Sequence, residues 1–261
     1  MSEFAHHRIL LTNDDGVNAH GLKVLEGIAR SLSDDIWIVA PELEQSGASH
    51  GLTLSQPLRV REIAPRHYAV QGTPTDCVML AVHELMGEQK PTLLLSGVNR
   101  GANLAEDVTY SGTIAGAMEG LLCGIPSIAF SQVVGRHATP EHFATAVQHG
   151  PALVRDLLRA GWGKDVLINV NFPGVAPDDV KGIEVTRQGF RDESELVIDK
   201  REDARGFPYY WFGFRRNYGN PDAGIDLRAV RDGYISVTPL HLDLTQDRAL
   251  AGLAQALEKK F

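Results

Sequence analysis

Short apolar runs alternate with amphipathic helical patterns along the first two-thirds of the chain. The first run, Ile9–Leu11, is followed over residues 21–32 by apolar residues at helical spacing, and a second run covers residues 36–40 and stops at Pro41. Runs of this length, bounded by polar and turn residues, are typical of strands buried on both faces of a parallel sheet. The order of strand, helix and strand predicts a βαβ unit with a right-handed crossover.

The same alternation continues and predicts an α/β fold with a mainly parallel sheet. We expect further strands at 92–96, 127–131 and 165–170, a last strand at 234–238 that stops at Pro239, and a hairpin of two short strands at 54–60 and 68–70. We expect three further helices. The first follows a turn at 72–76 and has Val78, Ala81, Val82 and Leu85 on its inner face. The second lies at 114–120, and the third runs from Thr139 to Leu158 with a kink at Gly150–Pro151.

The pattern changes beyond residue 183. Residues 186–224 are charged and aromatic without helical periodicity, and residues 207–214 are typical of a strand. We therefore predict a protruding β arm, and because exposed aromatic side chains often mark subunit contacts, we expect an oligomer. An amphipathic C-terminal helix follows at about 245–259. We treat residues 1–261 as one domain, with a core at about 1–183 and 231–240 and the arm at about 184–230.

Composition narrows the functional classes. The chain has 261 residues, a net charge of -8 and 43% hydrophobic residues, which is ordinary for a globular protein and argues against a general nucleic-acid or anionic-membrane surface. No apolar run is long enough to span a bilayer and no signal-peptide pattern is present, so we expect a cytoplasmic protein. The two cysteines, Cys77 and Cys123, are too far apart in sequence for a chelating pair.

Two adjacent carboxylates, Asp14 and Asp15, follow the first predicted strand. Ligands bind at the carboxyl ends of strands in open α/β sheets, and Asn13 and Gly16 favour a turn that brings both carboxylates to one site. Neighbouring carboxylates repel unless a cation or hydrogen-bond donors offset them, and oxygen ligands favour magnesium, manganese or calcium over zinc. An isolated Asp-Asp-Gly run is equally typical of a solvated turn.

Two more loops and one helix start supply polar groups at the same predicted edge. Ser46 and Ser49 lie in the loop 42–51, although a surface-loop serine usually has no chemical role. Asn99 and Asn103 lie in an expected loop at 97–103, which carries neither a dinucleotide nor a Walker fingerprint. Residues 111–113, Ser-Gly-Thr, begin a helix, where free N–H groups favour an anion, although a plain helix cap is the common alternative.

Together these residues predict a hard-metal site beside a phosphate site. Asp14, Asp15, Ser46 and Asn99 would surround the metal, while Asn103 and the turn of Ser111, Gly112 and Thr113 would hold phosphoryl oxygens. This arrangement fits metal-assisted hydrolysis of a phosphate ester. Either aspartate could be a ligand, a base or a nucleophile, and His241 and Asp107 are guesses for protonating the leaving group.

Several linked motifs, in order along the whole chain, resemble the SurE family of stationary-phase survival proteins, which are 5'/3'-nucleotidases. They are Leu10-Leu-Thr-Asn-Asp-Asp-Gly16, Ala40-Pro41, Gln45-Ser-Gly-Ala48, Gly72-Thr-Pro-Thr-Asp-Cys77, Ser96-Gly-Val-Asn-Arg-Gly-Ala-Asn103, Tyr110-Ser-Gly-Thr113 and Val237-Thr-Pro-Leu240.

This resemblance implies a Rossmann-like three-layer fold and a cytoplasmic enzyme that uses one divalent ion, magnesium or manganese. Its substrates would be nucleoside monophosphates and some short polyphosphate, and it would form a dimer or tetramer through the C-terminal arm. The implied metal ligands are Asp14, Asp15, Ser46 and Asn99, with Asn103 and residues 111–113 near the phosphate. The family commonly has glycine where this chain has Ala105, and the arm carries no motif that we can match.

Three other readings use a similar fold. A signalling receiver domain, or another non-enzymatic nucleotide-binding regulatory module, also has paired acidic residues, but a receiver needs an aspartate at the end of its third strand, where this chain has Ser96 and Asn99. An NAD-binding oxidoreductase is disfavoured by the missing glycine fingerprint. A haloacid-dehalogenase-type phosphatase would have Asp-x-Asp instead of adjacent aspartates.

Overall fold

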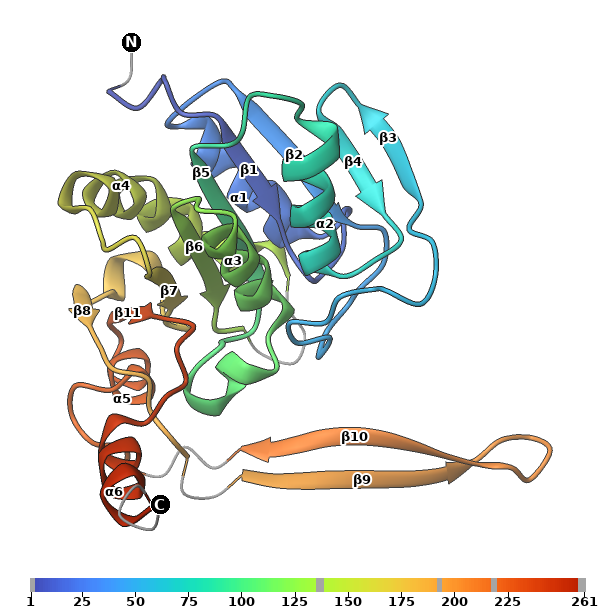
Figure 1. The fold of residues 1–261 in the computed structure, drawn as a ribbon, viewed down its shortest axis with the longest axis vertical. Helices are drawn as coiled ribbons and strands as arrows, with labels where there is room; N and C mark the ends of the chain where they lie inside the picture. Colours follow the sequence, from blue (N-terminus) through green and yellow to red (C-terminus); the bar gives the residue numbers. More distant parts are fainter. Residues whose placement is uncertain (1–2, 135–138, 192–193, 217–219, 258–261) are drawn as a thin grey trace.

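The computed structural model describes residues 3–134, 139–191, 194–216 and 220–257. It shows a Rossmann-like three-layer α/β fold with a central, mostly parallel sheet, helices on both faces, and an antiparallel hairpin that projects from the body (Figure 1). This confirms the predicted fold class. Within the described residues, no helix is both long and apolar enough to cross a membrane.

The central sheet has the strand order β3-β4-β2-β1-β5-β6-β7-β11-β8. Its strands are β1 (Ile9–Thr12), β2 (Ile36–Pro41), β3 (Val60–Ala64), β4 (His67–Val70), β5 (Leu93–Arg100), β6 (Ser127–Gln132), β7 (Leu167–Phe172), β8 (Ile183–Val185) and β11 (Ile235–Leu240). β1 pairs in parallel with β2 on one side and with β5 on the other. The direction in which strands are added therefore reverses between β1 and β5, which makes this the topological switch point where open α/β sheets bind ligands.

Two pairs of helices cover the two faces of the sheet. The longer helices are α1 (His20–Arg30), α2 (Pro74–Leu80), α3 (Gly112–Leu122) and α4 (Ala144–Ala160), with short helical turns η1 (Ala81–Leu85), η2 (Ala105–Thr109), η3 (Pro140–Phe143) and η4 (Pro177–Asp179). In β1, Ile9 and Leu11 pack into the core cluster of α1 and α4, whereas Leu10 packs into that of α2 and α3. Successive side chains of β1 point to opposite faces of the sheet, and both faces are covered by helices. The run Ile9–Leu11 is therefore apolar at every position.

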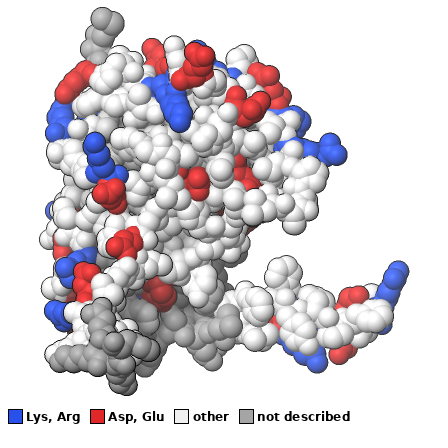
Figure 2. All heavy atoms as spheres, in the orientation of Figure 1, with Lys and Arg blue, Asp and Glu red and all other residues white. Residues whose placement is uncertain are grey.

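The C-terminal part departs from this layered plan. β9 (Ser194–Glu202) and β10 (Pro208–Arg216) form a two-stranded antiparallel hairpin outside the central sheet (Figure 1). Its aromatic side chains Phe207, Tyr209, Tyr210, Trp211 and Phe212 are exposed. Figure 2 shows the hairpin extending from a body on whose visible face acidic and basic side chains are scattered. The predicted arm is confirmed as a hairpin.

Two helices complete this part. α5 (Asp226–Arg231) packs against β11 and β7, and α6 (Asp247–Leu257) has no buried residue. Leu250, Leu253 and Leu257 of α6 are more than half exposed. The C-terminal helix was predicted at 245–259, and its last two residues lie outside the described residues.

Several predicted boundaries were wrong. The strand predicted at 54–60 begins instead at Val60, because β3 is an edge strand whose five residues are all exposed and leave no apolar pattern. The loop predicted at 97–103 begins too early, since β5 continues to Arg100 through a register irregularity against β6. β11 does not stop at Pro239 but runs to Leu240. The missing N–H of Pro239 is tolerated because β8 pairs with β11 only as far as Val237.

Candidate functional site

The turn after β1 places the two aspartates at the switch point. Asn13 closes this turn by donating its side-chain amide to the carbonyl of Gly16 at 2.9 Å. Gly16 has a φ of 98° and lies against the backbone of Leu43, so a side chain there would be strained. The backbone N–H of Gln45 donates to the carbonyl of Asp14 at 2.7 Å. The loop after β2, which carries Ser46, is thereby fastened to the turn that carries Asp14.

Asp14 is buried against the N-terminus of α3, with 4% of its surface exposed. The hydroxyl of Thr113 donates a hydrogen bond to Asp14 Oδ1. A Cβ added to Gly112 would lie 2.8 Å from Asp14 Cβ and 3.1 Å from Oδ2, so only glycine allows this approach. Burial raises the pKa of Asp14 to about 6, hydrogen bonds from Thr113 partly offset it, and the charge of Asp15 adds to the rise.

Asp15 joins the turn to the end of β5. Its Oδ2 accepts the backbone N–H of Arg100 at 2.9 Å, next in sequence to Asn99. Burial raises the pKa of Asp15, while the hydrogen bond and charge of Arg100 act in the opposite direction. Asn99 donates its side-chain amide to the carbonyl of Gly101 at 2.8 Å. Because the Nδ2 group is used within the loop, the amide oxygen is the atom of Asn99 suited to bind a cation.

Ser46 is exposed on the loop after β2. Its hydroxyl donates to Glu44 Oε1 at 2.8 Å, and Glu44 is 3.5 Å from the Arg100 guanidinium. Ser49 connects the same loop to the segment before α3, because its hydroxyl donates a hydrogen bond to the carbonyl of Thr109 at 2.6 Å. His50, 3.0 Å from Glu119 of α3, adds a second contact.

Asn103 is held by buried polar residues at the ends of β6 and β7. Its backbone N–H donates to Asn171 Oδ1 at 2.8 Å, and its side-chain amide donates to Ser131 Oγ at 2.9 Å. The side chains of Asn169 and Asn171 both donate to the carbonyl of Asn103, at 3.0 and 3.1 Å. Our sequence analysis missed these partners. The sequence does contain a feature that could have identified them. Otherwise apolar strands carry polar residues towards their carboxyl ends, namely Ser131, Asn169 and Asn171.

The residues predicted to bind phosphate have further contacts. Ser111 is the N-cap of α3, and its hydroxyl accepts the backbone N–H of Ile114 at 3.1 Å. Thr113 donates to Asp14, as described above. The α3 N-terminus thus has one carboxylate of this chain, Asp14, beside it, and the backbone of Thr113 also hydrogen-bonds to that carboxylate. The N-terminus of a helix favours an anion.

The two guessed proton donors lie in other surroundings. The carboxylate of Asp107 accepts a hydrogen bond from Arg191 at 2.8 Å, and the side chain of Arg191 is almost completely buried. His241 is exposed at the end of β11, where its charge acts on Asp243. Neither role receives support from these contacts.

The predicted metal ligands fit a divalent cation that prefers oxygen. They offer two carboxylates, one hydroxyl and one amide oxygen, which is the donor chemistry of magnesium or manganese sites. The raised pKa values of Asp14 and Asp15 indicate that burial disfavours their charges, as expected where a cation's charge is needed for balance. Among the described residues, no group of three or more His, Cys, Asp or Glu side chains is placed to hold a metal ion.

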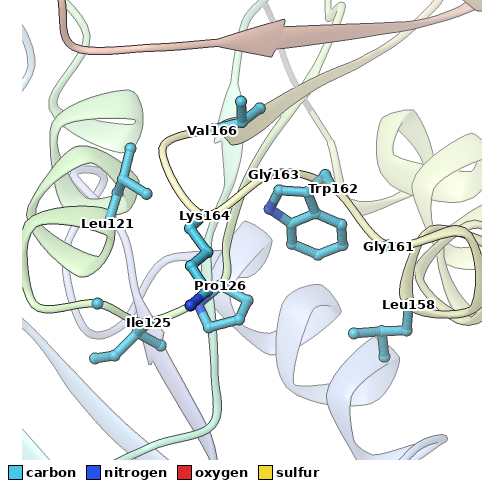
Figure 3. Close-up of a pocket in the computed structure, with 10 residues that line it drawn as sticks. Leu121, Ile125, Pro126, Leu158, Gly161, Trp162, Gly163, Lys164 and Val166 are labelled. Carbon is cyan, nitrogen blue, oxygen red and sulfur yellow. The ribbon is translucent and has the colours of Figure 1, made fainter.

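Two cavities differ in character. A cleft of about 260 Å³ opens beside Asp15 and is lined by Ala19, His20, Gly21, Glu44, Arg100, Thr139, Pro140 and Phe143. A larger cavity of about 470 Å³ lies at the opposite, amino-terminal edge of the sheet, where α3 leads into β6 and α4 leads into β7 (Figure 3). Its walls are mostly apolar, with the Trp162 indole and the Lys164 side chain facing into it.

Comparison with known proteins gives a consistent result. The family model described as "Survival protein SurE" matches residues 9–195. A protein named 5'-nucleotidase SurE from Caulobacter sp. (strain K31) is 59% identical over 252 residues, covering 96% of this chain and 94% of that protein. Another of that name from Parvibaculum lavamentivorans is 55% identical over 257 residues, covering 96% of this chain and 91% of its own.

A solved structure agrees with these relatives. The crystal structure of the SurE protein from Aquifex aeolicus superposes with a TM-score of 0.81 at 41% identity, covering 95% of this chain and 98% of that one. The similarity therefore extends beyond the sheet into the C-terminal part of the chain.

Proposed function

Because this chain belongs to the survival protein SurE family, we propose that it is a nucleotidase, a metal-dependent phosphomonoesterase that releases phosphate from nucleoside monophosphates. The observation that carries the proposal is Asp14, a carboxylate buried against the N-terminus of α3 with a second carboxylate, Asp15, beside it. The relatives are named 5'-nucleotidases. We extend the proposal to 3'-monophosphates and to short polyphosphate, on the family resemblance alone.

We propose that Asp14, Asp15, Ser46 and Asn99 hold one magnesium or manganese ion per subunit. When bound, such an ion neutralises phosphate charge and lowers the pKa of a water molecule. The four residues come from the turn after β1, the loop after β2 and the end of β5, and hydrogen bonds join these segments at the switch point, through Gln45 to Asp14 and through Arg100 to Asp15. These cross-links keep the ligands close together before any ion binds.

The remaining site residues act on the phosphate. Asn103 presents an amide whose backbone and side chain are already fixed, so it can hold a phosphoryl oxygen without reorganising. The N-terminus of α3, which begins at Gly112, supplies partial positive charge to the same oxygens. The cleft beside Asp15 offers space for the nucleoside. We assign no general acid.

We also propose that the protein is cytoplasmic and assembles as a dimer or tetramer through its C-terminal part. The exposed aromatic side chains of the β9–β10 hairpin and the exposed leucines of α6 support assembly, because both are apolar surfaces that water does not favour. The alternative of a receiver-like or regulatory module has no corresponding support, since β5 ends in Asn99 and Arg100 where a phospho-accepting aspartate would be needed.

The test is phosphate release by the purified protein from 5'-AMP, 3'-AMP and tripolyphosphate. The protein is first treated with a chelator and dialysed, and magnesium or manganese is then restored. We expect release from the nucleotides only when an ion is present. No release with either ion, from protein whose circular dichroism shows that it is folded, would overturn the proposal.

A further inference from the structure

Ala105 has an unusual backbone conformation in the segment between two proposed phosphate-binding positions, Asn103 and Ser111. Its φ is 52°, in the left-handed region that disfavours residues with a Cβ. Ala105 is also completely buried. A non-glycine residue in this conformation is strained and persists only where its surroundings hold it.

Two distant side chains hold both backbone polar groups of Ala105. The buried carboxylate of Asp226 accepts the N–H of Ala105 through Oδ2 at 2.8 Å. The side-chain amide of Gln188 donates to the carbonyl of Ala105 at 2.9 Å. Both partners come from the C-terminal part of the chain, so local sequence does not account for this conformation.

Asp226 joins three segments at this point. Its Oδ1 accepts the N–H of Gly189 at 2.9 Å and that of Leu227 at 2.7 Å, in addition to the bond from Ala105. A Cβ added to Gly189 would lie 2.8 Å from Oδ1, so the backbone approaches this carboxylate as closely as glycine permits. A fully buried carboxylate with three N–H donors is a fixed point in the structure.

Arg191 holds the next residues of the same segment. Its guanidinium donates to the carbonyl of Leu104 at 3.2 Å, to Glu106 Oε1 at 3.0 Å and to Asp107 Oδ2 at 2.8 Å. The carbonyl of Asp107 in turn accepts the N–H of Ser111 at 3.0 Å. A continuous series of hydrogen bonds therefore runs from Arg191 to the N-cap of α3.

We infer that Gln188, Arg191 and Asp226 are positioning residues for the proposed phosphate site, because they fix the segment 103–111 with Ala105 in its left-handed conformation. This inference rests on the proposed function for its catalytic consequence. The three residues do not touch the phosphate themselves. They set the distance between Asn103 and the α3 N-terminus, which a phosphoryl group must bridge. Gln188 and Arg191 lie just before β9 in the sequence. The residues that lead into the β9–β10 hairpin therefore also hold the segment 103–111.

The test compares Gln188→Ala and Asp226→Asn with Asp232→Asn, a control just after α5 whose carboxylate accepts a hydrogen bond from Arg228. Gln188 is exposed, so its variant should fold even if Asp226→Asn does not. We expect kcat/KM for 5'-AMP to fall about tenfold or more in both site variants, measured where circular dichroism shows them folded, since small displacements of positioning groups are costly. The control should stay within about twofold of wild type, as an exposed pair contributes little.

Ala105→Gly provides a readout that a merely structural role would not move. Glycine adopts a positive φ without strain, so the loss caused by Gln188→Ala should be smaller in the Ala105→Gly background than in the wild-type background. An equal loss in both backgrounds would overturn the claim that Gln188 holds the conformation of Ala105.

Hydrogen exchange separates this inference from the proposed function. Peptides covering residues 103–113 should exchange about tenfold faster in Gln188→Ala and Asp226→Asn than in wild type and Asp232→Asn, because their anchoring bonds are lost. A wild-type protein without nucleotidase activity would refute the proposed function and leave this measurement interpretable. Unchanged exchange together with unchanged kcat/KM in a folded variant would refute the positioning role.

Discussion

The two edges of the central sheet differ in what they bury. The carboxyl edge buries polar groups, including Asp14, Asn103, Asn169 and Asn171, each held by hydrogen bonds between segments that are distant in sequence. The amino edge has a larger cavity with mostly apolar walls and one ionisable side chain, Lys164 (Figure 3). The size of a cavity is therefore a poor guide to chemistry in this protein.

Helix orientation explains part of this difference. α3 begins at the carboxyl edge, where its N-terminal N–H groups face Asp14, and it ends beside the apolar cavity, where its last carbonyl groups lie. The helix dipole makes the first edge favourable and the second unfavourable for an anion. Variants at the carboxyl edge should therefore change activity more than stability, and variants at the amino edge should do the reverse.

The largest effect is expected for Asp14→Asn. Removing a metal-binding carboxylate should lower phosphate release about 10³-fold or more, because charge stabilisation at a buried site is lost. The matched control is Asp34→Asn, an exposed aspartate just before β2 at the amino edge, which should retain activity. The measurement is steady-state phosphate release with magnesium or manganese. Equal activity of both variants would remove Asp14 from the site.

The pH dependence of stability should change in the same variant. Burial raises the pKa of Asp14 from 3.8 to about 6, so the folded state holds this proton more tightly than the unfolded chain does. The stability that the neutral carboxyl contributes is present below about pH 4 and is lost as the pH rises through about 6. This difference between the folded and unfolded pKa corresponds to roughly 3 kcal/mol of folding stability.

The corresponding measurement is urea unfolding of the chelated protein between about pH 4 and pH 7. Asp14→Asn lacks the titrating group, so its unfolding free energy relative to wild type should increase over this range. Added magnesium should reduce the increase, because it stabilises the ionised wild-type site. A difference that does not vary with pH would contradict the assigned cause.

Gly112→Ala tests the close approach of α3 to Asp14. The new Cβ would lie 2.8 Å from Asp14 Cβ and 3.2 Å from a Pro74 carbon, so the carboxylate or the helix must move. A displacement of this kind should lower kcat/KM about 10²-fold. Gly27→Ala in α1 is the control, since its Cβ would meet nothing within 4 Å. It should keep full activity and gain up to about 1 kcal/mol of stability.

The smallest effects are expected at the apolar cavity. Trp162→Ala should lower the unfolding free energy by about 1–3 kcal/mol, because a partly buried aromatic side chain is lost from the edge of the core. Lys164→Gln should change it by no more than about 0.5 kcal/mol. Both should release phosphate within about twofold of the wild-type rate. A large loss of activity in either folded variant would show that the two edges are coupled.

The sequence predicted the buried strands well and the exposed elements poorly. β1, β2, β6 and β7 are buried on both faces, so each leaves an apolar run that is visible without a structure. The edge strand β3 has no buried residue and was misplaced, and β8 and the short helix α5 were missed. These elements form through contacts with segments that are distant in sequence. The spacing of apolar residues along the chain carries no information about such contacts.

The candidate site divides in the same way. Motif order and strand ends were enough to nominate Asp14, Asp15, Ser46, Asn99 and Asn103, and their assignment to metal or phosphate stays a prediction. The contacts that organise them were not visible. Thr113 donates to Asp14 across 99 residues of sequence, and Asp226 reaches Ala105 across 121.

By itself the sequence determined the α/β class, the arm and the residue types at each strand end, because burial and turn chemistry act over a few neighbouring residues. Tertiary structure decided which loops meet at the switch point, why Gly112 is needed beside Asp14, and how Asp226 holds a left-handed Ala105. These features depend on backbone approaches and buried hydrogen bonds between segments that only folding brings together.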